Sequence, residues 1–416
     1  MPPVLLTSAS GDVEGLEAYR RAGGWQALDK ALRSLAPDQV IAAVGAAGLR
    51  GRGGAAFPTA RKWKLASEAP GDPKYVVANG GEHEPGSHKD RLLTALHPHR
   101  VLEGIALCAF ATGASRAYLY LIEDMTEARA AAQRAIEEAA RAGLLGDRIL
   151  GSGFSLEVSV ALAPPTYVAG EETAALEVIE GRKAWPRQKP PFPGQAGLFG
   201  KPTTVNNVET LACVPAIIRE GAAWYRTMGT AECPGTMLCT LDDRVVRPGV
   251  YEVPFGITLR DLIYGSGGGP KSGRAIRGIL PAMSSSFLPA SALDTPLTHE
   301  ALRAAGSSLG CGGISFIEAG ECSVERVAAI AEFFKVEQCG QCPPCRMETG
   351  TLAMVMQQVR AGTGADYAAQ VEKITAFAAG KGYCSLIAMA AAPVQSALRC
   401  FPDDFAHHAK HGGCIL

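Results

Sequence analysis

The chain has 416 residues, of which 40 are basic, 41 are acidic and 47% are hydrophobic. This length predicts two or three domains with substantial cores, and the apolar fraction excludes wholesale disorder. The net charge of −1 lacks the excess of Lys and Arg that a nucleic-acid-binding protein normally needs to displace counterions. We therefore expect a globular protein that does not bind nucleic acid.

The sequence predicts no membrane span, because a span needs about 20 consecutive, mostly apolar residues. The first ten residues, MPPVLLTSAS, lack the basic region of a secretory signal. The expected location is cytoplasmic, either soluble or peripheral on a membrane complex. In that compartment the 12 cysteines are expected to be thiols or metal ligands rather than disulfides.

Strands and helices are predicted to alternate from the N-terminus to about residue 225. Residues 1–45 indicate a short tail and then helix, followed by a glycine-rich loop over 48–63. Further on, strands are predicted at 75–78, 117–122 and 154–162, and helices at 98–112, 126–142, 171–182 and 206–219. This alternation is typical of an α/β layered domain.

The pattern changes after residue 235. Short β-like segments (TMLCTL, GVYEV, IRGIL and GISFIEA) surround one short helix around 259–264, which predicts a small α+β domain. From Ser323 onward Ala, Met and Leu recur at helical spacing, interrupted by a cysteine loop at 339–345. We therefore expect three domains, with boundaries at 1–230, 231–320 and 321–416.

Three cysteines in the C-terminal region have the spacing of metal ligands. Cys339, Cys342 and Cys345 form C-x2-C-x2-C, on a loop that the prolines at 343–344 are expected to keep from being helical. Three thiolates at this spacing can surround one corner of a [4Fe–4S] cluster, with a fourth ligand from elsewhere.

The fourth ligand is expected to be Cys384, which lies 39 positions after the third cysteine, and Cys400 is the other candidate. Zinc is an alternative, although it prefers two separated C-x2-C pairs. The remaining interpretation is that these four cysteines are buried thiols that bind no metal. The other cysteines are expected to be small buried hydrophobic residues.

The glycine-rich loop admits two interpretations. Residues 51–56 fit G-x-G-x-x-[G/A], but the preceding segment is predicted as helix and no acidic residue ends a second strand about 20 residues on. The glycines would still allow a phosphate or a ring to approach the backbone closely. Nucleotide binding and a plain turn therefore both remain open.

Three further loops carry charged residues next to predicted elements. Residues 79–90 follow a strand, where ligands collect in open α/β sheets, or form a solvated acidic loop. Residues 170–173 open a helix, where backbone N–H groups face a ligand or where two glutamates simply suit the helix dipole. The basic, proline-rich stretch 182–194 could hold a diphosphate and stack a base, or be an exposed loop.

Five segments occur in one order along the chain: GLRGRGGAAFPTARKW, NGGEHEPGSHKDR, GEETAALEVIEGR, RQKPPFPGQAGLFGKPTTVNNVET, and the cysteine set CGQCPPCR plus GYCSL. Together they resemble the NADH-binding flavoprotein subunit of respiratory complex I and the related diaphorase subunits of NAD-linked hydrogenases and formate dehydrogenases. The resemblance covers residues 48–405. It implies an α/β, Rossmann-like FMN/NADH domain, then a small β-grasp (ubiquitin-like) domain, then a C-terminal helical bundle carrying an iron–sulfur cluster.

The resemblance also implies the site residues. FMN would contact Gly51, Gly53, Lys62, Asn79, Glu82, Gly170, Glu171, Val205, Asn206, Asn207 and Thr210. NADH would contact Gly54, Phe57, Lys62, Glu84, Glu172, Lys189 and Phe192, with Glu82 and Glu84 in positioning roles. The [4Fe–4S] cluster would be held by Cys339, Cys342, Cys345 and Cys384. Glu172 would repel the 2′-phosphate of NADPH, so NADH should be preferred.

The implied activity is that of an NADH:acceptor oxidoreductase subunit. NADH passes a hydride to FMN, and electrons then move singly to the [4Fe–4S] cluster. The direction could also be reversed, with NAD+ reduced by electrons from another subunit. The implied partners are a thioredoxin-like [2Fe–2S] subunit and a further iron–sulfur or catalytic redox subunit, and membrane contact would be only indirect. The alternative is a non-catalytic electron wire or scaffold with a degenerate flavin and nucleotide pocket.

The sequence departs from the family pattern at four places, and two of them, Gly81 and the prolines at 164–165, motivate that alternative. Gly81 stands where an Asp is usual, His83 where a Gly is usual, and Leu65 where an aromatic residue is usual. The prolines at 164–165 replace a glycine-rich stretch and must reshape that loop. These changes surround the expected nucleotide pocket and leave the cysteine set intact.

Overall fold

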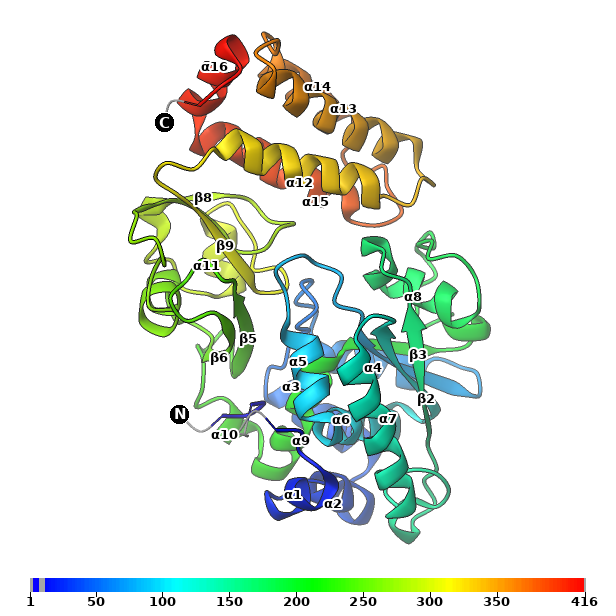
Figure 1. The fold of residues 1–416 in the computed structure, drawn as a ribbon. Coiled ribbons are helices and arrows are strands. Elements are labelled where there is room, and N and C mark those ends of the chain that lie inside the picture. Colours follow the sequence, from blue (N-terminus) through cyan, green and yellow to red (C-terminus); the bar gives the residue numbers. More distant parts are fainter. Residues whose placement is uncertain (1–2, 7–11, 415–416) are drawn as a thin grey trace.

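The computed structural model of the chain describes residues 3–6 and 12–414. Three regions follow one another along the sequence, and the C-terminal helices cover both the α/β region and the small mixed sheet (Figure 1). Among the described residues, no helix is both long enough and apolar enough to cross a membrane.

The N-terminal region is built around a parallel sheet of four strands in the order β3-β2-β1-β4. The strands are β1 (Lys74–Gly80), β2 (Ala114–Ile122), β3 (Glu157–Ala163) and β4 (Thr203–Asn207). The helices are α1 (Leu16–Arg21), α2 (Gln26–Ser34), α3 (Pro37–Ala46), α4 (Thr59–Glu68), α5 (Lys89–Leu96), α6 (Pro98–Thr112), α7 (Thr126–Arg141), α8 (Glu172–Ile179), α9 (Val208–Glu220) and α10 (Ala222–Tyr225). Short helical turns cover Ile149–Gly151, Tyr167–Gly170 and Leu198–Gly200.

Both faces of this sheet are buried, as is usual for parallel sheets. On β1, Val76 and Ala78 join the main core that includes α6 and α9, whereas Tyr75 and Val77 join a second cluster with α8. The alternation of side chains along a strand thus explains why the predicted strand is a continuous apolar run.

The order of the strands creates the position expected for a ligand. From β1 the chain crosses to β2 and β3 on one side, and later returns to β4 on the other side of β1. Ala78 and Asn79 of β1 pair with Asn206 and Asn207 of β4. Ligands of open α/β sheets bind outside the carboxyl ends of the strands at such a reversal, which here is the end of β1 and β4.

The second region is a five-stranded sheet in the order β6-β5-β9-β7-β8. Its strands are β5 (Thr236–Leu241), β6 (Gly249–Pro254), β7 (Ile276–Leu280), β8 (Leu288–Pro289) and β9 (Gly313–Glu318). The first and last strands are parallel neighbours and the other pairs are antiparallel, as expected for a β-grasp arrangement. The predicted short helix is a π-helix at Asp261–Ser266, and further helices cover Ala290–Ala292 and α11 (His299–Ala304).

The third region is helical: α12 (Ser323–Glu337), α13 (Pro343–Arg360), α14 (Tyr367–Ala378), α15 (Leu386–Cys400) and α16 (Pro402–His411). The expectation that the prolines keep residues 343–345 out of a helix is wrong, because α13 begins at Pro343. Proline suits the first helical turn, where its missing N–H has no intrahelical partner anyway. Cys345 therefore lies in the first turn of a helix.

Strand β4 was not among the predicted strands, and the helix predicted from 206 begins at Val208. Its sequence is short and carries two asparagines, so only its pairing with β1 fixes it as a strand. The third strand spans 157–163 rather than 154–162. The predicted domain boundaries at 230 and 320 fall between elements, in the connections 226–235 and 319–322, and remain predictions.

Candidate functional site

The glycine-rich loop between α3 and α4 lies against the start of α9. The backbone N–H of Arg52 donates to Oγ1 of Thr210 at 2.8 Å. A Cβ on Gly53 would lie 3.3 Å from the Cβ of Asn207, and Gly54 has φ +99°. Close packing at Gly53 and a left-handed backbone at Gly54 therefore favour glycine at both positions. As expected, a helix precedes the loop, so it differs from the usual Rossmann turn.

Asparagine side chains connect the ends of β1 and β4. Nδ2 of Asn79 donates to the carbonyl of Gly170 at 2.9 Å, and Nδ2 of Asn207 donates to the carbonyl of Asn79 at 3.1 Å. Oδ1 of Asn206 accepts from Nε1 of Trp63 at 2.8 Å. The Nδ2 of Asn206 has no protein partner within the described part of the chain, so this donor is available to a ligand. The strand ends thus form a polar cradle beside the glycine-rich loop.

Four charged side chains alternate in sign at the edge of this cradle. Nζ of Lys62 donates to the carbonyl of Val205 at 2.9 Å and lies 3.2 Å from Glu172. Nζ of Lys189 lies 2.9 Å from Glu171 and 3.2 Å from Glu172. Burial raises the pKa of Glu172, but Lys62 and Lys189 outweigh it and hold that pKa below its usual value.

Three apolar side chains at the expected NADH pocket lie at the surface, where the family resemblance implies that they would contact the adenine. Phe57, Phe192 and Leu65 are 39%, 55% and 55% exposed. Single exposed apolar side chains are common on protein surfaces, so this exposure alone does not identify a binding site. Their position is compatible with an adenine pocket open to solvent, and this pocket stays a prediction.

The buried carboxylate of Glu82 shapes its own loop. It accepts from Oγ of Ser87 at 2.6 Å and from the backbone N–H groups of Asp90 and Arg91, both at 3.1 Å. These bonds fix the turn that leads into α5. Any contact between Glu82 and a flavin would therefore come from a side chain that the fold already holds rigidly.

Glu84, two residues further, faces the mixed-sheet region. Its carboxylate accepts from the backbone N–H of Ser284 at 3.2 Å and from Oγ of Ser284 at 3.0 Å. Burial is the main cause that raises the pKa of Glu84. The expected bond to NADH would thus have to share this carboxylate with Ser284.

The two departures at 81 and 83 belong to one arrangement. A Cβ on Gly81 would lie 3.2 Å from Nε2 of His83, and a Cβ on Gly170 would lie 3.1 Å from Cδ2 of the same ring. Nε2 of His83 is buried and has no hydrogen-bond partner among the described residues. Burial lowers the pKa of His83 to about 4, so the ring is neutral near pH 7. The imidazole occupies the space that the absent side chain at 81 leaves.

The four expected cluster ligands line one cavity. Cys339, Cys342, Cys345 and Cys384 share it with apolar neighbours that include Leu386. Burial raises the pKa of Cys345 to about 12 and that of Cys384 to about 11, so bound iron would have to stabilise the thiolates. The thiols are the ligands that a [4Fe–4S] cluster takes, and their shared cavity fits it.

The spacing of these sulfurs distinguishes an iron–sulfur cluster site from a site for a single metal ion. Among the described residues, no three of them lie within 4.8 Å of one another. A cubane holds its ligands further apart than one tetrahedral zinc does, so the arrangement favours the cluster. Cys400 does not line this cavity, and its sulfur lies 3.5 Å from the carbonyl of Phe287.

Sequence reasoning missed two kinds of residue. Val168 and Pro186 come from the α/β region and line the cysteine cavity, and no local signal indicates this. The expectation that the remaining cysteines are buried holds for Cys108, Cys213, Cys233 and Cys239. It is wrong for Cys311, Cys322, Cys400 and Cys414, which are half-buried. Of these, Cys322 and Cys414 lie beside His408.

A polar cradle at the strand reversal, joined to a four-thiol cavity, defines a flavin- and iron–sulfur-binding oxidoreductase subunit. Family models match this division: the "Nuo51 FMN-binding domain" at residues 44–216, the "SLBB domain" at 243–278 and the "NADH-ubiquinone oxidoreductase-F iron-sulfur binding region" at 325–408. The chain belongs to the family of NADH-quinone oxidoreductase F subunits.

Known relatives span nearly the whole chain. It is 41% identical over 415 residues to the second F-type NADH-quinone oxidoreductase subunit of Rhizobium meliloti, covering 99% of each chain. It is 39% identical to the F-type NADH-quinone oxidoreductase subunit of Escherichia coli, covering 94% of this chain and 88% of the relative. The solved "NAD+-reducing [NiFe]-hydrogenase in the H2-reduced state" matches with a TM-score of 0.82 and 30% identity, over 99% of this chain and 70% of that one.

These findings confirm the expected class. The chain is an oxidoreductase subunit with FMN and a [4Fe–4S] cluster as cofactors and NADH as substrate, and it works with partner subunits. The individual contacts to FMN and NADH remain predictions, because the similarity to relatives does not assign them residue by residue.

Proposed function

We propose that this chain is the NADH-oxidising electron-input subunit of a larger redox complex. One observation carries the proposal: the short turn Tyr167–Gly170 joins the two centres. The carbonyl of Gly170 accepts from Asn79 in the flavin cradle at 2.9 Å, and Val168, two residues earlier, lines the cysteine cavity. Such closeness is what electron transfer between a flavin and a cluster requires.

FMN, when bound, accepts a hydride from NADH, and the cluster then carries electrons one at a time. The chain supplies binding, orientation and charge. Asn79 and Asn206 would donate to the polar groups of FMN, and Lys62 would place a positive charge beside them. Asn207 would shape the cradle instead, because its Nδ2 already donates to the carbonyl of Asn79 at 3.1 Å and to Asp90 at 2.6 Å. Gly53 and Gly54 would let the nucleotide approach the backbone.

At the nucleotide side, Glu172 and Lys189 would divide the recognition. Lys189 would face the diphosphate, and Glu172 would repel a 2′-phosphate by like-charge exclusion. Phe57 and Phe192 would contact the adenine. Glu171 would act between the nucleotide pocket and the cysteine cavity. Its carboxylate pairs with Lys189 at 2.9 Å. Burial is the main cause of the raised pKa of Cys384, and the charge of Glu171 adds to it.

The direction and the partners are part of the proposal. The relatives named as NADH-quinone oxidoreductase subunits support NADH oxidation. Electrons would then leave through a thioredoxin-like [2Fe–2S] subunit to a further redox subunit, as the sequence resemblance implies. The fold similarity to an NAD+-reducing hydrogenase favours the reverse direction as the second candidate. Membrane contact would be indirect, through the complex.

The test is an anaerobic absorbance titration of the purified protein with NADH, and with NADPH in parallel. Bleaching of a flavin band near one equivalent of NADH, and weaker bleaching with NADPH, is the expected result. Iron–sulfur absorbance without flavin, even after FMN is added, would reject this function and favour an electron wire or scaffold. If the protein binds no flavin, Gly81 and His83 would be the first positions to change back to the residues usual in the family, Asp and Gly.

A further inference from the structure

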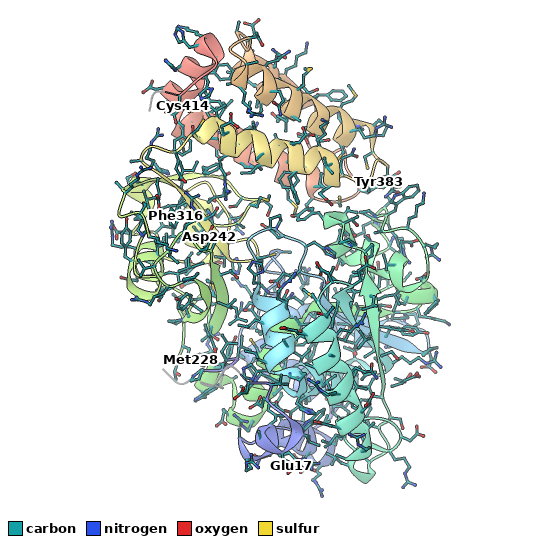
Figure 2. The ribbon with its side chains drawn as sticks, viewed as in Figure 1. Glu17, Met228, Asp242, Phe316, Tyr383 and Cys414 are labelled. Carbon is teal, nitrogen blue, oxygen red and sulfur yellow. The ribbon has the colours of Figure 1, made fainter. Side chains whose placement is uncertain are left out.

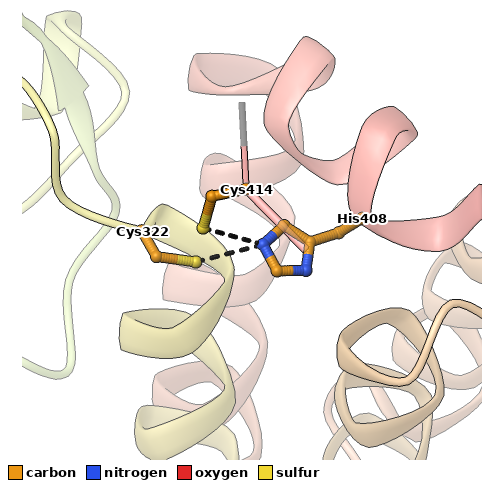
Figure 3. Close-up of side chains that lie close together, drawn as sticks. All are labelled: Cys322, His408 and Cys414. Carbon is orange, nitrogen blue, oxygen red and sulfur yellow. Dashed lines mark hydrogen bonds between the residues drawn. The ribbon is translucent and has the colours of Figure 1, made fainter. Parts of the chain in front are cut away.

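Two cysteines and one histidine that the redox sites do not use converge at the far end of the helical region. Cys322 directly precedes α12, His408 lies in α16, and Cys414 follows α16 after two glycines. Figure 3 shows both sulfurs facing the same ring nitrogen. Nε2 of His408 lies 3.2 Å from the sulfur of Cys322 and 3.0 Å from that of Cys414.

The three ligand atoms lie within 4.8 Å of one another, close enough to share one ion. Tetrahedral zinc, with Zn–S of about 2.3 Å and Zn–N of about 2.0 Å, would separate nitrogen and sulfur by about 3.5 Å. The sulfurs would thus have to move outward by only a few tenths of an ångström. Both cysteines are half-buried, which leaves them room to do so.

The imidazole of His408 is buried, and its Nε2 lies next to both sulfurs. The residue is 3% exposed, and its Nδ1 is buried without a hydrogen-bond partner among the described residues. Nε2 is therefore the nitrogen that the fold presents to the two sulfurs. A neutral ring that carries its proton on Nδ1 is the form that ligates a metal through Nε2.

The surrounding charges have both signs, because the group lies near one guanidinium and two carboxylates. The guanidinium of Arg277, from β7, faces both sulfurs and pairs with Asp404 at 2.9 Å. Asp404 also accepts from Oγ of Ser323 at 2.7 Å, so its carboxylate already has two partners. The carboxylate of Glu325 also faces Cys414. Two thiolates, a neutral imidazole and a divalent cation together carry no net charge, so binding leaves no buried charge uncompensated.

We propose that Cys322, His408 and Cys414 form a structural zinc site. Soft thiolates with an imidazole select zinc over magnesium or calcium, and the fourth tetrahedral position would take water or a further ligand. The ion would connect the segment after α16 to the start of α12. In Figure 2, Cys414 and Tyr383, which borders the cluster cavity, lie at opposite ends of the helical region, so the two metal sites are separate.

The test uses the holoprotein, purified under reducing conditions and incubated with Zn²⁺, then desalted. We expect about one zinc per chain beside about four iron atoms, and a zinc X-ray absorption spectrum with two sulfur ligands and one histidine. Cys414→Ser and His408→Ala should lose the zinc and keep iron and FMN. Cys400→Ser, which changes a half-buried cysteine outside the group, should keep all three.

Three results would overturn the proposal. Less than about a tenth of an equivalent of zinc in the wild-type protein would show that the group binds no ion. A spectrum with four sulfur ligands would place the zinc at the cluster cysteines instead. A Cys322–Cys414 disulfide in the purified protein, found as a peptide pair resistant to alkylation, would make the arrangement a covalent one. The zinc X-ray absorption spectrum of the wild-type protein tests the proposed ligands even if a variant fails to fold.

Discussion

The carboxylate of Glu172 lies 3.2 Å from the ammonium groups of both Lys62 and Lys189. The three side chains come from α8, from α4 and from the proline-rich loop, so segments far apart in the sequence meet at this one charge. The two lysines also hold the pKa of Glu172 below its usual value despite burial, which keeps it ionised at neutral pH. The negative charge is thus fixed at the edge of the flavin cradle.

The first prediction concerns nucleotide choice. Glu172→Gln should raise kcat/KM for NADPH about tenfold and change that for NADH less than about threefold, because it removes a like charge and frees two lysines. Steady-state kinetics with both nucleotides and an artificial acceptor measure the ratio. Glu68→Gln, an exposed carboxylate on α4, is the matched control. An unchanged ratio in Glu172→Gln would remove this residue from nucleotide selection.

The second prediction separates the two candidates for the fourth cluster ligand. Cys384 lines the cavity with the C-x2-C-x2-C cysteines, and Cys400 does not. Cys384→Ser should therefore lose most of the iron and acid-labile sulfide, whereas Cys400→Ser should retain both. Iron analysis and low-temperature electron paramagnetic resonance of the reduced proteins report the difference. Loss of iron in Cys400→Ser alone would reverse the assignment.

The sequence could predict those features whose pattern lies within a few consecutive residues, and not those that depend on contacts between distant residues. The cysteine triplet and the apolar run of β1 lie within a few residues, so spacing and composition identify them. The strand β4 has no such signal, because its two asparagines become strand residues only by pairing with Ala78 and Asn79. The anchoring of Asn206 by Trp63 is equally non-local, since 143 positions separate them.

The same limit applies to the candidate site. Family resemblance named Glu84 as a nucleotide contact, but the bond from Ser284 spans 200 positions and is visible only in the fold. The group at His408 is similar, because 86 positions separate this residue from Cys322. Tertiary packing, rather than any motif, brings these side chains together.

The third prediction concerns a buried charge network beneath the flavin cradle. Nζ of Lys89 lies 2.6 Å from Asp90, 2.9 Å from Glu209 and 3.2 Å from Oδ1 of Asn207. Lys89→Met would leave buried Asp90 without its cation and Glu209 with only Arg52, 4.0 Å away, so we expect a loss of about 3–5 kcal/mol in the free energy of unfolding. Denaturant titration followed by circular dichroism measures it.

The control for this network is Lys335→Met. Lys335 is exposed and pairs with Glu332 at 2.9 Å. Surface pairs of this kind contribute less than about 1 kcal/mol, so this variant should unfold almost like the wild-type protein. Equal losses in the two variants would mean that Lys89 only fills space.

The fourth prediction follows from the buried ring of His83. Its pKa is about 4 in the folded chain against 6.5 for a free side chain, because burial disfavours the charged form. Between these pH values the unfolded chain binds a proton that the folded chain does not, so stability falls as the pH drops below 6.5. His83→Gln lacks this proton. At pH 5.5 we expect it to gain about 1 kcal/mol relative to the wild-type protein, compared with pH 7.5.

Thermal unfolding of both proteins at the two pH values provides the measurement. The comparison between proteins cancels the other groups that titrate over this range, which include His299. A difference in Tm between the two proteins that does not change with pH would show that His83 is protonated equally in the folded and unfolded chains.

The fifth prediction is that positions 81 and 83 depend on each other. A Cβ on Gly81 would lie 3.1 Å from Oδ1 of Asn79 and 3.2 Å from Nε2 of His83. A third contact would be Cε1 of Tyr120 at 3.2 Å. Gly81→Ala should therefore weaken FMN binding about tenfold, and in a His83→Gly background less than about threefold, because one of the three close contacts is gone. Fluorescence titration of the FMN-depleted protein gives the four dissociation constants of the cycle.

Gly153→Ala is the matched control, because a Cβ at Gly153 would meet nothing within 4 Å. It should leave FMN binding unchanged, so that any loss at position 81 reflects local crowding and not the substitution of a glycine in general. If the effects of Gly81→Ala and His83→Gly simply add, the two departures are independent. A positive coupling would instead mean that the histidine ring took over the space of the missing side chain, and that the flavin pocket was rearranged and not abandoned.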